Sequence, residues 1–176
     1  MTNTQQFIKV YMFGIQWKNN KGFTVMEIIV VTAVMSLILV TILGLLSLES
    51  KISEQNRLKL KAIATLEETI ESVRNFRDNT AWFPTGIGGL VVGSNYYPVI
   101  ASSGWSFVLG TETTDGFTRS VVFSGVSRDA DSNIESSYNP ANNDPDTKKV
   151  TITVSWNDRT GSKNETLITY VTNWQK

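Results

Sequence analysis

Near its N-terminus the chain reads Lys21-Gly22-Phe23-Thr24-Val25-Met26-Glu27-Ile28-Ile29-Val30, and this segment leads into a long apolar run. From Ile28 to Leu48 there are 21 residues and no charge. A helix needs about 20 apolar residues to cross the hydrocarbon core of a bilayer, so this run is long enough. Glu27 stands at its start, where a carboxylate costs less than the roughly 2.5–3.5 kcal/mol it costs at the centre of a membrane helix. Glu27 therefore needs a partner.

Two ordinary explanations account for only part of this segment. A cleaved signal peptide has an apolar core of about 7–15 residues followed by an Ala-x-Ala-like site. The run here is longer, and no such site follows Leu48. A simple signal anchor explains the hydrophobicity but does not explain Gly22-Phe23 together with Glu27.

The segment resembles the prepilin-type cleavage and methylation motif of type IV pilins and pseudopilins. That motif commonly reads Lys/Arg-Gly-Phe-Thr-Leu-x-Glu followed by aliphatic residues. Val25 and Met26 are apolar variants of it, and the residues that match position by position are Lys21, Gly22, Phe23, Thr24 and Glu27. The clear resemblance covers about residues 18–50, and the rest of the chain is compatible with the family without being diagnostic.

The resemblance implies that a prepilin peptidase recognises Lys21 and Gly22, cleaves between Gly22 and Phe23, and methylates the new amine of Phe23. Residues 1–22 are then a leader and take no part in the mature fold. This leader is longer and more apolar than many in the family, and initiation at Met12 would give a more ordinary one.

Glu27 is the assembly residue that the resemblance implies. In a filament it would meet the Phe23 amine of a neighbouring subunit and so set the register between subunits. Two alternatives stay open. The amine is four positions away, about one helical turn, so the two groups could pair within one chain. Glu27 could also reach the lipid headgroups as a charge at the positive end of the helix dipole.

Charge predicts the orientation of the segment. The leader contains Lys9, Lys18 and Lys21 and no acid, which leaves 13 basic and 16 acidic residues and a net charge of −3 after it. The lysines before the apolar run favour a cytoplasmic N-terminus, with the C-terminal domain outside the inner membrane. The acidic balance gives no case for a nucleic-acid site.

Composition argues against catalysis. The chain has no cysteine and no histidine, so disulfides, thiolate nucleophiles, Ser-His-Asp triads and histidine ligands are excluded. No Walker or dinucleotide phosphate loop is present. We expect a protein that is not an enzyme and has no cofactor.

The helix is predicted to continue beyond the membrane segment and to end near Phe76–Asp78, before Pro84. Its apolar stripe recurs at spacings of three, four or seven and comprises Leu48, Ile52, Lys59 by its stem, Ile63, Leu66, Ile70 and Val73. Gly44 marks a kink or local melting, or allows close helix packing. The predicted organisation is a leader (1–22), a transmembrane or filament-core helix (23–48), its amphipathic continuation (49–78) and a β-rich domain (79–176).

The C-terminal domain is predicted to be a small antiparallel sheet, which makes the fold α+β. Its β-rich runs are Leu90–Val92, Tyr96–Ile100, Trp105–Leu109, Phe117–Phe123, Lys149–Trp156 and Thr166–Val171. Residues 157–162 are typical of a hairpin loop. Its tryptophans and the Tyr96-Tyr97 pair could form a recognition surface, although such residues more often form the core.

Residues 128–147 are predicted to form an exposed loop of about 20 residues. Asp129, Asp131, Asp144 and Asp146 are weak calcium candidates in it, because Asp129 to Asn133 has the alternating oxygens of a calcium loop. Ile134 stands where the EF-hand pattern needs glycine, which favours an ordinary solvated loop.

The function expected from the sequence is structural: a pilin-like subunit, preferably a minor one, of a type IV pilus or of a secretion or DNA-uptake pseudopilus. Its expected partners are the prepilin peptidase, other pilin or pseudopilin subunits, an inner-membrane assembly platform, and the lipid bilayer before assembly. The competing class is a signal-anchored binding or sensing domain on the outer face of the membrane.

Overall fold

The computed structural model describes residues 22, 24–102 and 104–174, and the chain divides into two compact units after Leu48. The predictions that fall on residues 1–21 and on Phe23 lie outside the described residues. The described part of the first unit is helical from Val25, and the helix α1 (Val25–Asn79) continues through the first 31 residues of the second unit. The predicted long helix is confirmed.

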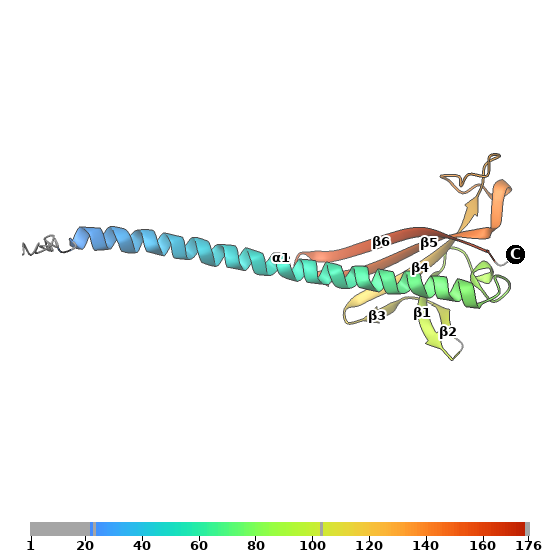
Figure 1. Cartoon of the computed structure of the whole chain (residues 1–176), viewed down its shortest axis with the longest axis horizontal. Helices are drawn as coiled ribbons and strands as arrows, with labels where there is room; N and C mark the ends of the chain where they lie inside the picture. The colour runs from blue at the N-terminus through green and yellow to red at the C-terminus, as the bar shows by residue number, and fades with distance from the viewer. Residues whose placement is uncertain (1–21, 23, 103, 175–176) are drawn as a thin grey trace, which may run out of the picture. The chain divides into compact units, whose positions relative to one another are not determined.

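The second unit contains a six-stranded antiparallel sheet. Its strands are β1 (Asn95–Ala101), β2 (Gly104–Leu109), β3 (Glu112–Thr114), β4 (Phe117–Ser127), β5 (Asn143–Asp158) and β6 (Gly161–Thr172). The order is β2-β1-β4-β5-β6, with β3 paired to β4 (Figure 1). The α+β class is therefore confirmed. The longest strand, β5, pairs without interruption with β6 from Thr147–Thr172 to Asp158–Gly161.

One face of α1 packs on this sheet and forms the core. The helix contributes Ala62, Leu66, Ile70, Val73 and Phe76, at spacings that keep them on one side. The inward residues of β4 and β5 face them because strand side chains alternate: Val121, Phe123, Val150, Ile152, Val154 and Trp156. Thr69 and Ser72 are also buried, and their hydroxyls donate to the carbonyls of Thr65 and Thr69, so burial leaves neither unsatisfied.

The predicted apolar stripe is wrong in its first half. Leu66, Ile70 and Val73 are buried, but Leu48 and Ile52 are 53% and 49% exposed. Lys59, which the prediction included by its stem, forms an ion pair with Glu165 of β6 at 2.9 Å. Packing begins only near Leu58, where the sheet comes alongside, so periodicity alone could not show where the buried face starts.

Two predictions in the β-rich part also need correction. Leu90–Val92 is not a strand, because Ile87–Gly89 forms a 3-10 turn and Val91 and Val92 are exposed. The predicted loop 128–147 is shorter, since β5 begins at Asn143 and pairs across a bulge with Ser127. The aromatic prediction favouring the core is confirmed for Trp82, Trp156 and Tyr96 and is wrong for Trp174, which is exposed.

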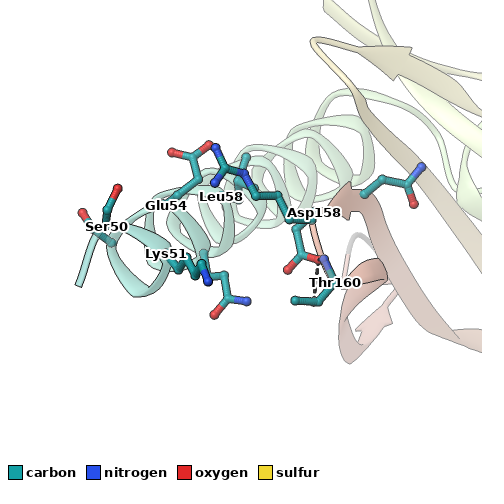
Figure 2. Close-up of a pocket in the computed structure, with 10 residues that line it drawn as sticks. Ser50, Lys51, Glu54, Leu58, Asp158 and Thr160 are labelled. Carbon is teal, nitrogen blue, oxygen red and sulfur yellow. Dashed lines mark hydrogen bonds between the residues drawn. The ribbon is translucent and has the colours of Figure 1, made fainter. Parts of the chain in front are cut away.

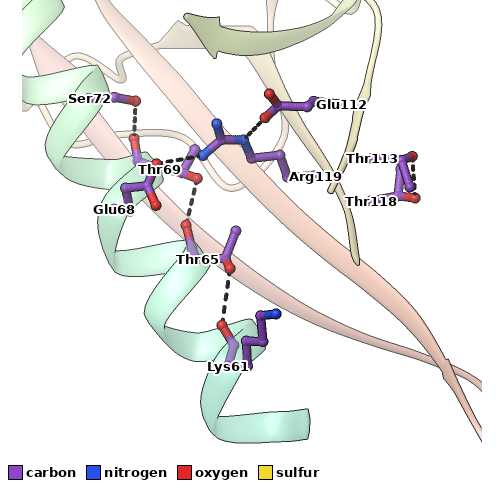
Figure 3. Close-up of polar contacts among 9 residues, drawn as sticks. All are labelled: Lys61, Thr65, Glu68, Thr69, Ser72, Glu112, Thr113, Thr118 and Arg119. Carbon is purple, nitrogen blue, oxygen red and sulfur yellow. Dashed lines mark hydrogen bonds and ion pairs between the residues drawn. The ribbon is translucent and has the colours of Figure 1, made fainter. Parts of the chain in front are cut away.

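Polar contacts fix the helix to the sheet beside this core. Arg119 of β4 is largely buried, with 13% of its side chain exposed. Its guanidinium donates to Glu68 of α1 at 3.0 Å and to Glu112 of β3, so one side chain joins three elements (Figure 3). Charge-assisted hydrogen bonds from a guanidinium are stronger than neutral ones, so this junction should matter for stability.

Replacing Arg119 by methionine should lower the free energy of unfolding of residues 49–176 by about 1–2 kcal/mol, since both charged hydrogen bonds are lost. Arg74→Met is the matched control. Arg74 pairs with Glu71 on the exposed helix surface, so its loss should change stability by less than about 0.5 kcal/mol. Urea denaturation measures both, and equal effects would show that Arg119 does not hold the helix on the sheet.

Candidate functional site

The candidate site lies at the start of α1, where a threonine caps the helix. Thr24 precedes the first helical residue, and its side-chain Oγ1 accepts the backbone N–H of Glu27 at 3.3 Å. The Thr24 carbonyl accepts from the N–H groups of Glu27 and Ile28, at 3.0 and 3.2 Å. A threonine at the cap satisfies a backbone donor that the helix cannot satisfy itself.

Glu27 occupies the third position of the helix. Thr24 and Glu27 have the Thr-x-x-Glu spacing of a capping box, and a carboxylate in the first turn is favoured by the helix dipole. Among the described residues, no side chain donates to the Glu27 carboxylate. The Thr-x-x-Glu spacing of Thr24 and Glu27 was a sequence signal from which this capping relation could have been predicted. Glu27 therefore has a local structural role and a carboxylate still available for a partner.

No contact in the described structure requires a glycine at position 22. It lies before the helix, is exposed, and its backbone is outside the left-handed region. A Cβ built on it meets no described atom within 4 Å. The other two residues of the predicted cleavage site, Lys21 and Phe23, lie outside the described residues.

The apolar run following this site is exposed along its whole helical length, Val25 to Leu48. Three of its hydroxyl groups are hydrogen-bonded within the helix. Thr32, Ser36 and Thr41 donate to the carbonyls three residues earlier, at 3.0, 2.8 and 2.7 Å. In lipid such bonds matter because no water replaces them. Gly44 lies within continuous helix, so α1 is not broken there.

Length and composition make this helix a candidate membrane span. A soluble chain rarely exposes so continuous an apolar surface unless a membrane or a partner covers it. The coarse part of the predicted location is thus supported: the segment is long and apolar enough to cross a bilayer.

Three of the four acidic candidates of the 128–147 segment, Asp129, Asp144 and Asp146, accept hydrogen bonds from other groups of the second unit. Asp129 accepts the backbone N–H groups of Asp131 and Asn133 through one carboxylate oxygen, at 3.0 and 2.8 Å. Asp146 accepts the side-chain amide of Asn173 at 3.1 Å. In the described part of the chain, no three acidic side chains converge as a cation site would require.

Asp144 is held by an arginine. Partial burial acts to raise its pKa, but hydrogen bonds from Arg128, Thr147 and the backbone of Asp146 outweigh burial and leave the pKa below its ordinary value. The Arg128 guanidinium donates to its carboxylate at 2.6 Å. A calcium ion at Asp144 would have to displace or repel this guanidinium.

We therefore expect calcium to leave the thermal unfolding of residues 49–176 unchanged. The protein would be melted with calcium and with a chelator, and the Asp144→Asn variant would be melted in parallel. That variant should lower the melting temperature equally in both conditions, because it weakens the pairing with Arg128. A saturable rise in melting temperature with calcium that Asp144→Asn abolishes would contradict this expectation.

Comparison with family models, curated proteins and solved structures finds no match to this chain.

Proposed function

We propose that this chain is a structural, pilin-like subunit of a type IV pilus or of a related secretion or DNA-uptake pseudopilus, and preferably a minor subunit. In this proposal a prepilin peptidase removes residues 1–22 and methylates Phe23. The mature subunit then waits in the inner membrane, with its N-terminus cytoplasmic and its sheet domain outside. An assembly platform transfers it into a filament of similar subunits.

The proposal depends mainly on one observation. An apolar stretch of helix that is exposed around its whole circumference follows directly after the Gly22-Phe23 dipeptide and the Glu27 carboxylate. A plain anchor needs the hydrophobic helix only. A subunit that must leave the bilayer needs a helix whose whole circumference can exchange lipid for neighbouring helices, as Val25–Leu48 could. The hydroxyls bonded within the helix add no unsatisfied groups during that exchange.

The second unit supports the same function by carrying its own core. Burial of Phe123, Ile152 and Val154 between α1 and the sheet does not involve residues before Glu49. Extraction of the apolar segment would therefore leave the outer domain folded. In this proposal the subunit works by assembly and catalyses no reaction, which matches the absence of histidine and cysteine in the sequence.

Incorporation into a filament tests the function. Filaments sheared from cells that express the other subunits of one assembly system should contain the mature chain, detected by immunogold labelling of residues 49–176. A mature chain that always stays in the membrane fraction, in cells whose filaments form normally, would favour a signal-anchored binding domain instead.

A further inference from the structure

A polar groove lies in the second unit where the first turns of α1 after the apolar run meet the tip of the β5–β6 hairpin (Figure 2). We call it the juxtamembrane groove. Its walls are helix residues from Ser50 to Leu58 and hairpin residues 157–160, and its volume is about 800 Å³. The hairpin turns tightly there, since Asp158 pairs directly with Gly161.

The sequence distance between Leu48 and Lys51 bears on whether the groove can meet a membrane surface. Lys51 follows Leu48 by three residues of continuous helix, a rise of about 4.5 Å. The headgroup layer on each side of a bilayer is about 5–8 Å thick. If the helix spans the membrane, Lys51 falls within this layer, and Arg159 on the opposite wall of the groove lies near the same level.

The two acids of the groove are bound by neighbours. Glu54 accepts two hydrogen bonds from Arg57, at 2.8 and 2.9 Å. Asp158 accepts the backbone N–H and the hydroxyl of Thr160, both at 2.6 Å. Both carboxylates are therefore already hydrogen-bonded to donors of the protein.

The two cations of the groove remain available. Neither Lys51 nor Arg159 makes a hydrogen bond or ion pair with any described residue, although Arg159 lies close enough to Glu54 to influence it electrostatically. Lys59 and Lys61, farther along α1, are instead paired with Glu165 and Asp115. Exposed cations without partners among the described residues thus stand on both walls of the groove.

We propose that the juxtamembrane groove binds the phosphate of an anionic phospholipid headgroup between Lys51 and Arg159. An arginine suits this ligand because its planar guanidinium can donate two parallel hydrogen bonds to one phosphate. The contact ties the hairpin tip to the outer surface of the inner membrane while the subunit waits in the bilayer. This contact is lost when the subunit is extracted from the bilayer, so it opposes premature extraction. The inference rests on the membrane insertion contained in the proposed function.

The test uses the full chain in lipid nanodiscs, and the absence of native cysteines allows single labelled positions. A fluorophore on Ser162→Cys reports the hairpin without lying in the groove. A nitroxide on the lipid headgroup should quench it increasingly as phosphatidylglycerol replaces phosphatidylcholine. Lys51→Gln and Arg159→Gln should each raise the phosphatidylglycerol fraction needed for half-maximal quenching about five-fold.

Two controls make each outcome decisive. Arg74→Gln removes a cation 23 residues farther along the helix, about 35 Å from Lys51, and should leave the titration unchanged. If Arg74→Gln shifted the titration as much as Lys51→Gln and Arg159→Gln, the groove proposal would be wrong, and nonspecific electrostatic attraction to the membrane surface would explain the quenching. A label on Val40→Cys should be quenched by nitroxides on the acyl chains. If the Val40→Cys label is quenched but the quenching of Ser162→Cys does not depend on phosphatidylglycerol, the groove proposal is wrong and membrane insertion still holds. If Val40→Cys is not quenched, membrane insertion fails as well.

Discussion

A Gly22→Val chain should accumulate in the membrane as full-length precursor, with nearly all mature product lost. The folded protein offers no reason for this loss, because the position is exposed and a side chain would meet no described atom. The valine would instead obstruct the peptidase, which the family resemblance implies requires a residue without a side chain before the scissile bond. Immunoblotting of membrane fractions separates precursor from mature chain.

Gly44→Val is the matched control for this experiment. Gly44 is also exposed, a Cβ added to it would meet no described atom within 4 Å, and it lies in helix that valine can continue. This variant should be cleaved normally. Phe23→Ala should also be cleaved and should affect methylation or packing more. Normal maturation of Gly22→Val would contradict the assignment of the cleavage site.

Glu27→Gln should leave cleavage and membrane insertion intact and abolish incorporation into filaments. Without the Glu27 carboxylate, the amine of a neighbouring Phe23 would be an ion without a partner in an apolar core. That situation costs several kcal/mol, on the order of a hundred-fold or more in the assembly equilibrium. The structure sharpens the choice of variant, because glutamine also suits the third position after a threonine cap. Glu27→Gln therefore removes the charge while keeping a residue type that the cap favours.

Glu27→Leu and Glu49→Gln complete the comparison. Glu27→Leu removes both charge and capping function, whereas Glu49→Gln removes a carboxylate at the other end of the apolar run and should assemble normally. If Glu27 only stabilises the helix start or reaches the headgroups, Glu27→Gln will assemble normally too. Cross-linking between Val25→Cys and Ile28→Cys of adjacent subunits, performed with the native Glu27 and again in the Glu27→Gln background, would show directly whether the register depends on this charge.

The long helix and the main strands could be predicted because their signals are local. An uncharged run from Ile28 to Leu48 and the strict alternation of Val150 to Trp156 each specify one type of element. The start of β5 could not be predicted, because Asp144 and Pro145 are typical of turns. There the strand is stabilised by distant contacts: pairing with Ser127 across a bulge and the Arg128–Asp144 ion pair.

The candidate site and the groove also differ in how local their sequence signals are. Gly22, Phe23 and Glu27 lie within six consecutive residues, so a local motif in the sequence was sufficient to single them out. The juxtamembrane groove depends on where the tip of a hairpin falls along the helix, which brings Arg159 beside Glu54 across more than a hundred residues. No local pattern contains that information. For the same reason, periodicity could not show that Ile52 stays exposed while Ala62 is buried.

The N-terminal residue of the mature protein shows whether the leader is removed between Gly22 and Phe23. The chain would be purified from membranes of a cell that contains a prepilin peptidase and analysed by intact mass and N-terminal sequencing. We expect a protein that begins at Phe23 and carries one methyl group on its amine. A chain that retains residues 1–22, or one cut after the apolar run, would contradict it.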